Sequence, residues 1–329
     1  MQRMAADVVL LQDHGCMEDA LRAVKTQAKD LWTGTRKLSW RTQQSHPVKA
    51  GRPYGGTVSA LAGTAASMAG SSILDPTGWS RYHGTVLHGS GKGKIALFNT
   101  YLPCDSDAGT SLWKQQADAL IAEGHPSDVC PWTVAVNDIM ATIDALPRGT
   151  QVIICGDLNV TLADKGRPSG TTSSSEKRRR RALLSACAER GLVDLWTEQY
   201  PDETVWTRQQ RMDDLAGCSH IDHVIVSRSL VEARALRIGV LTGEVLNASD
   251  HRLLMLEIKS TAAFAPQREK ENRAKPKPLS LQDNKSVAEY AEAVLRLFKR
   301  EAVHSLEEME TMAALPERRS ELRGKLDAW

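Results

Sequence analysis

The chain has 329 residues, of which 41% are hydrophobic and 25% are charged, and its formal net charge is +2. These values are ordinary for a soluble globular protein, and the length allows one large core or one core plus a smaller appendage. The near-neutral charge neither requires nor excludes a nucleic-acid partner, so any such case must come from local sites.

The pattern of cysteines and the absence of long apolar runs indicate the cellular compartment of the protein. The six cysteines are scattered and form no CxxC pair, which favours a reducing compartment. No apolar run approaches the ~20 residues needed to cross a bilayer, and no signal-peptide pattern starts the chain. We therefore expect an intracellular protein without membrane contact, in the nucleus or the cytoplasm.

Apolar runs bounded by turn residues predict mixed strands and helices in the first half of the chain. Val8–Leu11 is compact and apolar, as in a buried strand that needs sheet neighbours and a covering helix. The glycine-rich turn His88–Gly91 predicts a hairpin and lacks the spacing of a phosphate-binding P-loop. The predicted elements are a strand at Val8–Leu11, a helix at Met17–Ala28, a strand at Thr57–Leu61, and hairpin strands at Trp79–Leu87 and Lys94–Tyr101.

The second half continues this pattern, without strict βαβ alternation or an internal repeat. Pro147 stops one predicted helix, and Gly191 caps another. A Ser/Thr/Gly loop leads into the basic run Lys177–Arg181, which precedes the capped helix. The predicted elements are helices at Leu112–Ala122, Trp132–Leu146 and Ala182–Arg190, and strands at Gln151–Cys155, Val205–Thr207, His223–Val226 and Leu253–Ile258.

The composition changes after Ile258. The stretch Ala262–Pro278 is rich in charge and proline and lacks hydrophobic periodicity, which is typical of a linker. Beyond it, Ser286–Glu289 has the form of a helix capping box, and apolar residues follow at helical spacing. We predict one domain over residues 1–258, a linker over 259–284 and a helical tail over 285–329.

The strongest local signal is Gly156-Asp157-Leu158-Asn159, directly after an apolar run. Side chains two positions apart in an extended chain project to the same side, so Asp157 and Asn159 share one face while Leu158 turns toward the core. Paired oxygen-bearing groups at a strand end suit a hard cation or a positioned water molecule. An Asx turn that only ends the strand explains the same residues.

Two further acidic positions stand beside histidines, at Asp222-His223 and Asp250-His251. An acid that enters a strand of Val and Ile is costly unless it is paired. We expect Asp222 to pair with His251 and to fix the tautomer of that histidine. A carboxylate beside an imidazole also offers a metal ligand and a general base at one place. His223 points the other way in the strand and is expected to be structural.

Several separated motifs stand in a specific order along the chain. They are Leu11-Gln12-Asp13, Asn99–Pro103, Gly156–Asn159, Trp206-Thr207, Ile221–His223 and Ser249–His251. Their order and spacing resemble the endonuclease/exonuclease/phosphatase superfamily, which includes exonuclease III and the abasic-site endonucleases, over roughly Met1 to Ile258. The resemblance implies an α/β fold, a four-layer sandwich of two mixed β-sheets flanked by helices.

The resemblance also implies a reaction, which is in-line attack of water on a phosphodiester. The cation, usually Mg²⁺ with Mn²⁺ as the alternative, polarises the phosphate and stabilises the leaving oxyanion. The general base stays open between Asp157 and His251. The implied catalytic residues are Tyr101, Asp157, Asn159, Asp222 and His251, and the implied metal ligands are Asp13 and Asp250.

Two departures from the family pattern bear on activity. Asp13 stands where the family has a metal-binding glutamate, and its side chain is shorter by about 1.5 Å. Members of the family also begin with a further strand that carries a functional asparagine, and nothing before Met1 supplies it here. We therefore expect an N-terminally truncated chain that is a weak or inactive nuclease.

Within the superfamily, Gly191–Trp196, Tyr200-Pro201 and Thr204–Thr207 resemble a stretch common in the endonuclease domains of non-LTR retrotransposons. That resemblance implies a DNA partner and, in a longer parent protein, a reverse transcriptase domain. The basic run opposes a helix macrodipole, which a polyanion would relieve, although a solvated helix start explains it too. The expected nucleic-acid contacts are Lys177, Arg178, Arg179, Arg180, Arg181 and Trp206.

Three other functions stay open. The first is an abasic-site repair endonuclease or exonuclease, which shares the same motifs. The second is a phosphatase acting on a small or lipid substrate, which the Trp206-Thr207 stretch disfavours. The third is a degenerate, non-catalytic nucleic-acid-binding module, which the missing first strand favours.

Overall fold

The structure is a computed structural model, and the part of the chain that it describes ends at Phe264. The described residues are 6–13, 15, 22, 38–43 (backbone only), 55–89, 93–106, 108–109, 111–163, 166–167, 172–209, 217–241 and 249–264. The chain divides into two compact units, Met1–Glu269 and Lys270–Trp329, and all described residues belong to the first. The predicted helical tail, almost all of the predicted helix Met17–Ala28 and most of the predicted linker lie outside the described residues. None of the helices among the described residues combines the length and the apolar character needed to span a membrane.

A six-stranded sheet forms the centre of the first unit, in the order β4-β5-β6-β7-β11-β8. Strands β6 and β7 run parallel and the other neighbours run antiparallel, so the sheet is mixed. The predicted hairpin is confirmed, since β5 and β6 pair from Tyr82↔Thr100 to His88↔Lys94. The strands are β4 Ala69–Leu74, β5 Tyr82–His88, β6 Lys94–Tyr101, β7 Thr150–Asp157, β8 Leu192–Asp194 and β11 Asp222–Ser227.

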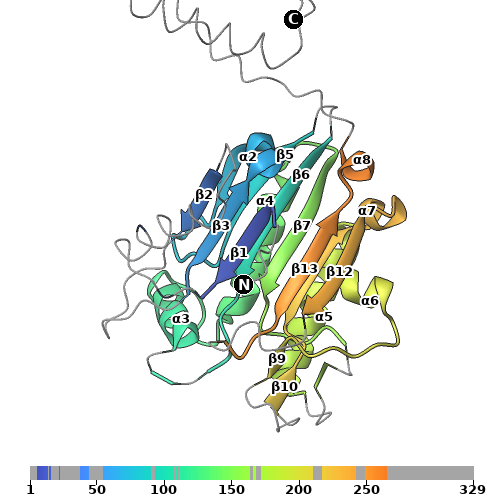
Figure 1. The fold of residues 1–329 in the computed structure, drawn as a ribbon. Helices are drawn as coiled ribbons and strands as arrows, with labels where there is room; N and C mark the ends of the chain where they lie inside the picture. The colour runs from blue at the N-terminus through green and yellow to red at the C-terminus, as the bar shows by residue number, and fades with distance from the viewer. Residues whose placement is uncertain are drawn as a thin grey trace, which may run out of the picture. The chain divides into compact units, whose positions relative to one another are not determined.

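A second strand layer packs on one face of this sheet (Figure 1). It consists of the antiparallel sheets β1-β3-β2 and β12-β13. Leu61 and Ile238 of the second layer share one apolar core with Leu97, Ile153 and Val224 of the six-stranded sheet. These strands are β1 Val8–Gln12, β2 Leu38–Gln43, β3 Thr57–Ala62, β12 Leu236–Leu241 and β13 Leu253–Ile258.

Helices cover the opposite face of the six-stranded sheet. Trp132 and Ile139 of α4 and Leu183 of α5 form a second apolar core with Phe98 and Ile154 of the sheet. Sheets flanked by helices are the architecture that the sequence predicts. The helices are α2 Gly63–Met68, α3 Leu112–Ala122, α4 Pro131–Asp144, α5 Ser174–Glu189, α6 Leu195–Gln199, α7 Arg228–Glu232 and α8 Ser260–Ala263, and the short strands β9 Arg208–Gln209 and β10 Cys218–Ser219 form a separate pair.

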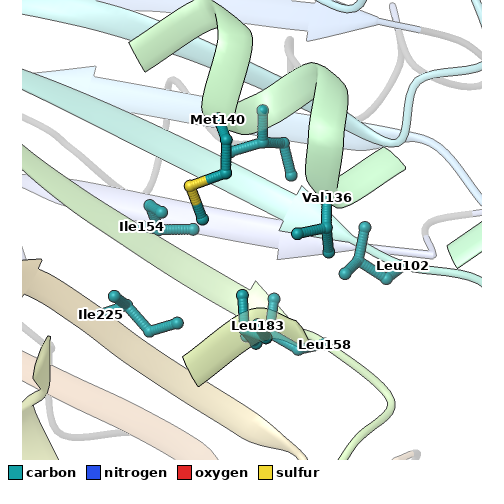
Figure 2. A pocket seen from close by; sticks show the side chains of 8 residues that line it. Leu102, Val136, Met140, Ile154, Leu158, Leu183 and Ile225 are labelled. Atoms are coloured by element: carbon teal, nitrogen blue, oxygen red, sulfur yellow. The ribbon is translucent and has the colours of Figure 1, made fainter. Parts of the chain in front are cut away.

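An apolar pocket lies within this second core (Figure 2). Met140 and Val136 reach into it from α4, and Leu158 closes it just after the end of β7. Its lining side chains are all hydrophobic, so it offers no group that would bind a charged ligand. The pocket is part of the packing beneath the sheet and not a substrate site.

Three predicted elements differ from the structure. The helix α5 begins at Ser174 and not at Ala182, because the Ser173 side chain caps it by accepting the amide of Glu176. The basic run therefore lies within the helix. The predicted strand Val205–Thr207 is absent, and pairing starts only at β9. The strand β1 is half-buried and not buried, since among the described strands it pairs only with β3.

Candidate active site

Tyr101, Asp157 and Asp222 lie in a row across neighbouring strands of the six-stranded sheet. Tyr101 of β6 is in register with Asp157 of β7, and Asp157 is in register with Asp222 of β11. Residues in register across a sheet point to the same face. The strand pairing thus brings together three residues that are distant in the sequence.

The end of β7 depends on a glycine. Gly156 has φ +148°, and a Cβ there would lie 1.8 Å from the carbonyl oxygen of Thr100. No other residue type fits this close approach between β6 and β7. Gly156 therefore allows Asp157 to sit directly beside the end of β6.

Asn159 follows in the left-handed conformation that asparagine tolerates, with φ +48°. Its backbone amide donates to Asp157 Oδ1 at 2.9 Å, and its side-chain amide donates to Asp157 Oδ2 at 3.2 Å and to the carbonyl of Leu102 at 2.8 Å. Leu158 between them is buried in the second core. The Asx turn and the shared polar face, which the sequence leaves as alternatives, are thus present together.

The predicted pair of Asp222 and His251 forms. His251 Nδ1 lies 3.0 and 2.9 Å from the two carboxylate oxygens of Asp222, and His251 Nε2 lies 4.0 Å from Asp157 Oδ2. The imidazole therefore bridges two buried carboxylates. His251 belongs to the segment before β13, which only the tertiary fold carries to this edge of the sheet.

Crowding of these groups shifts their protonation. Burial and the charge of Asp222 raise the pKa of Asp157 to about 8. Burial alone would lower the pKa of His251, but the hydrogen bond and charge of Asp222, with the charge of Asp157, raise it to about 9. Asp157 and His251 thus retain protons that a cation would displace.

The same three side chains are the described group that best fits a metal ion. One ligand atom from each of Asp157, Asp222 and His251 lies within 4.8 Å of the others. Two carboxylates and an imidazole suit a divalent cation. Asp250, predicted as a ligand, is not part of this group of described residues, and its carboxylate accepts a hydrogen bond from Arg208 Nε at 2.8 Å.

Asp13 adjoins the row from the side of Tyr101. Its carboxylate accepts the backbone amide of Gly55 at 2.6 Å. Burial, the charges of Asp13 and Asp157, and a hydrogen bond with Asp13 all raise the pKa of Tyr101, so the phenol stays protonated at neutral pH. Tyr101 therefore links Asp13 to the three-residue group.

Thr207 is a positioning residue whose role the sequence analysis missed. It is fully buried, and its Oγ1 accepts the backbone amides of Ile221 and Asp222, both at 3.1 Å. Its carbonyl accepts the amide of Arg252, next to His251, at 2.6 Å. Both members of the Asp222–His251 pair are therefore attached to Thr207. The sequence feature that could have indicated this role is a hydroxyl residue shortly before a strand.

We expect Thr207→Val to lower the free energy of unfolding by about 2 to 6 kcal/mol. It leaves two buried amides without an acceptor, at a cost of ~1–3 kcal/mol each. Urea unfolding measures the change. The control Thr207→Ser keeps the hydroxyl and should lose less. A loss in Thr207→Val no larger than the loss in Thr207→Ser would contradict this role of the hydroxyl.

His223 is buried and structural in its contacts, as predicted. Its ring lies 3.3 Å from Asp194 Oδ1 through Nδ1 and 2.9 Å from the carbonyl of Val160 through Nε2. Both partners only accept hydrogen bonds, so both ring nitrogens donate and the ring is charged. Burial opposes that charge, but Asp194 outweighs it and raises the pKa of His223. The ring thus ties the turn after Asn159 to β8.

The basic run divides between buried and exposed side chains. Arg179 is buried, bonds Asp105 at 2.6 Å and lies over the Trp113 ring at 5.3 Å, so it holds the loop after β6 and is not presented to solvent. Trp206 is half-buried, and its carbonyl accepts Arg252 Nη1 at 3.2 Å. The remaining side chains are Lys177, Arg178 and Arg181, which are exposed, and Arg180, which is half-buried.

Comparisons with known families and solved structures show which proteins share this fold. A sequence model of the Endonuclease/Exonuclease/phosphatase family matches residues 2–251. No curated protein sequence matches the chain. The AP endonuclease LMAP from Leishmania major is 17% identical, with a TM-score of 0.54, covering 78% of this chain and 79% of its own. An AP endonuclease from Archaeoglobus fulgidus is 15% identical, with a TM-score of 0.51, covering 77% and 88%. These structures confirm the predicted fold class.

Proposed function

Because the chain belongs to the endonuclease/exonuclease/phosphatase family, we propose that it is a divalent-metal-dependent phosphodiesterase that hydrolyses DNA. The observation that carries the proposal is the group of Asp157, Asp222 and His251, whose ligand atoms lie within 4.8 Å of one another beside Asn159. A hard cation held there would polarise the phosphate and stabilise the leaving oxyanion. The side chains around the cation accept and donate the protons that move during hydrolysis.

In this proposal Asp157 is the general base. Its pKa, about 8, lies near neutral pH, where a base combines proton affinity with availability. The side-chain amide nitrogen of Asn159 donates to Asp157 and to the Leu102 carbonyl, so its Oδ1 is the atom that accepts a hydrogen bond from the attacking water and orients it. Asp222 holds Nδ1 of His251 and raises the pKa of the ring to about 9, so Nε2 donates a hydrogen bond to a phosphate oxygen when the ring is protonated and is a metal ligand only when the ring is neutral. The neutral phenol of Tyr101 is a further donor once a phosphate oxygen replaces Asp13 as its acceptor.

DNA is the proposed substrate for two reasons. The exposed Lys177, Arg178 and Arg181 lie on one helix and can neutralise backbone phosphates. Two solved structures of the same fold are AP endonucleases. The finer proposal is an endonuclease of the retrotransposon type, supported by the Gly191–Trp196 stretch, with a reverse transcriptase domain in a longer parent protein and with Asp13 and Asp250 near the metal.

We expect nicking of supercoiled DNA by the purified chain to require Mg²⁺ or Mn²⁺ and to be abolished by EDTA, and robust nicking would contradict the weak or inactive nuclease expected from the sequence. The cation offsets the repulsion between the acidic cluster and the phosphate, so its removal leaves no path for hydrolysis. Asp157→Ala should reduce nicking to background. Gel assays on supercoiled, abasic and single-stranded DNA measure each case.

The outcomes of this assay separate the alternative functions. Preference for abasic DNA indicates a repair enzyme, and binding without cleavage indicates a non-catalytic module. Hydrolysis of small phosphate esters without nicking indicates a phosphatase. Asp118→Ala is the matched control, since Asp118 is an exposed carboxylate of α3 and should keep full activity. Nicking that persists in EDTA or in Asp157→Ala contradicts the proposal.

A further inference from the structure

Arg208 is an arginine of the candidate site to which the mechanism above gives no role. Its backbone pairs with Ser219 of β10 on one side and forms a bridge with His251 on the other. The amide of Gln209 donates to the carbonyl of Asp250 at 2.7 Å, which joins the same two segments. The fold therefore places Arg208 next to the catalytic histidine and fixes its backbone on both sides.

Within the part of the chain that the structure describes, the side chain of Arg208 is held at one point. Its Nε donates to Asp250 Oδ2 at 2.8 Å, and among the described residues no other group accepts a hydrogen bond from this guanidinium. The Arg208 side chain is 30% exposed and that of Asp250 is 42% exposed. A guanidinium carries five N–H donors in a planar fork, and Nε supplies one of them. Among the described residues nothing accepts from the two terminal amino groups, which are thus available to a ligand.

Arg208 also faces the acidic group electrostatically. Burial and Asp222 raise the pKa of Asp157, and the charge of Arg208 acts against them. Burial likewise raises the pKa of Cys104 on the loop after β6, and the charge of Arg208 again acts in the opposite direction. The positive charge therefore lies within reach of both sides of the site. Two carboxylates repel a phosphodiester, so a cation at this position favours its approach.

The ion pair contributes little to the fold itself. Backbone hydrogen bonds already connect the segment of Arg208 to that of Asp250 and His251. Half-exposed ion pairs add little stability because water screens them. A carboxylate that engages Nε does, however, turn the outer edge of the fork toward a ligand, as in bidentate recognition of phosphate. The arrangement is suited to binding an anion.

We propose that Arg208 binds the non-bridging oxygens of a substrate phosphodiester, and that Asp250 orients Arg208 for this contact. The inference rests on the proposed function and deepens it, since it names the residue that recognises the phosphate. It also gives Asp250 the role of a positioning residue for an arginine.

The test measures binding separately from cleavage. Fluorescence anisotropy of a labelled duplex oligonucleotide, in EDTA and in Ca²⁺, compares wild type with Arg208→Ala and Arg208→Lys. We expect Arg208→Ala to weaken binding about 10-fold or more and to raise KM more than it lowers kcat, since a hydrogen bond to a charged group is lost. Arg208→Lys should restore part of the affinity, because lysine keeps the charge but lacks the fork.

A neutral methylphosphonate placed at each phosphate in turn locates the contact. In wild type, one position should reproduce the loss seen in Arg208→Ala, and in Arg208→Ala that position should have no further effect. The control Arg228→Ala removes an exposed arginine at the far end of β11 and should bind like wild type. Circular dichroism melting shows whether each variant stays folded.

The outcomes distinguish this inference from the proposed function. If wild type binds but does not cleave, and the position-specific loss is present, the proposed hydrolysis fails while the phosphate contact stands. If cleavage occurs and Arg208→Ala binds and cleaves like wild type, the contact is wrong and the function stands. Absence of DNA binding by wild type, or an equal loss in Arg228→Ala, also overturns the inference.

Discussion

Asp157→Asn is expected to raise the melting temperature of the chain near pH 8 while lowering metal-dependent DNA cleavage by about 10²–10⁴-fold. Burial and the neighbouring charge of Asp222 raise the pKa of Asp157 from 3.8 to about 8, so its charged form is disfavoured in the folded state. Asparagine has nearly the same shape and carries no charge. The substitution therefore removes the base and relieves the repulsion together.

The sign of the pH dependence follows from the direction of the shift. The stability that protonated Asp157 contributes is fully present below its unfolded pKa of 3.8 and is lost as the pH rises through about 8. For His251, the contribution is fully present below 6.5 and is lost as the pH rises through about 9. Wild type should therefore lose stability across this range, and Asp157→Asn should lose less of it.

Thermal unfolding in EDTA, followed by circular dichroism across this pH range, measures the effect without a metal ion. Asp118→Asn is the matched control, because Asp118 is an exposed carboxylate and its loss should leave the pH dependence unchanged. If Asp157→Asn melts at or below the wild-type temperature at high pH, the repulsion between Asp157 and Asp222 does not destabilise the folded state.

Asp75→Ala is expected to lower the free energy of unfolding by about 3–5 kcal/mol, the usual cost of removing one partner of a buried ion pair. Asp75 and Arg81 are both buried, and the Asp75 carboxylate accepts bonds from Arg81 N, Nε and Nη2 at 3.0, 2.8 and 2.8 Å. The carbonyl of Arg81 accepts the amide of Tyr101 at 2.8 Å. The loss should therefore also disturb Tyr101 and reduce cleavage.

Urea unfolding of two further variants gives reference values for the loss of stability in Asp75→Ala. Asp138 also pairs with Arg81 but is 32% exposed, so Asp138→Ala should cost less. Asp118→Ala, on the surface, should cost no more than about 0.5 kcal/mol. Burial opposes ionisation of Asp75, but Arg81 outweighs it and lowers the pKa. The stability that Asp75 adds is thus present above pH 3.8 and is lost as the pH falls below it. A loss for Asp75→Ala as small as that for Asp118→Ala would contradict this account.

The sequence by itself determined the parts of the site whose chemistry is local. Gly156, Asp157 and Asn159 stand within four positions, and the glycine, the strand end and the Asx turn each follow from residue type. The pair Asp222 and His251 could also be predicted, because an acid entering an apolar strand needs a partner. The fold class was implied by the resemblance of the motifs, in their order and spacing, to the endonuclease/exonuclease/phosphatase superfamily.

Strands whose formation depends on a neighbouring strand could not be predicted from the sequence. Leu38–Gln43 has no compact apolar run, and it forms β2 because β3 offers a free edge. Leu236–Leu241 contains an arginine and a glycine, yet it pairs along its whole length with β13. Strand formation in such segments is stabilised by the partner strand and not by intrinsic propensity, so a single sequence carries little signal for it.

Only the tertiary structure decided which side chains meet. The row of Tyr101, Asp157 and Asp222 depends on the register of three strands, and a shift by one residue would turn each side chain to the opposite face. The same holds for partner choice, since Arg208 pairs with Asp250 and Arg179 is buried against Asp105. Residue types and spacing indicated the candidate groups of the site. Long-range pairing selected the ones that share a site, because contact energies between distant segments exist only once the chain has folded.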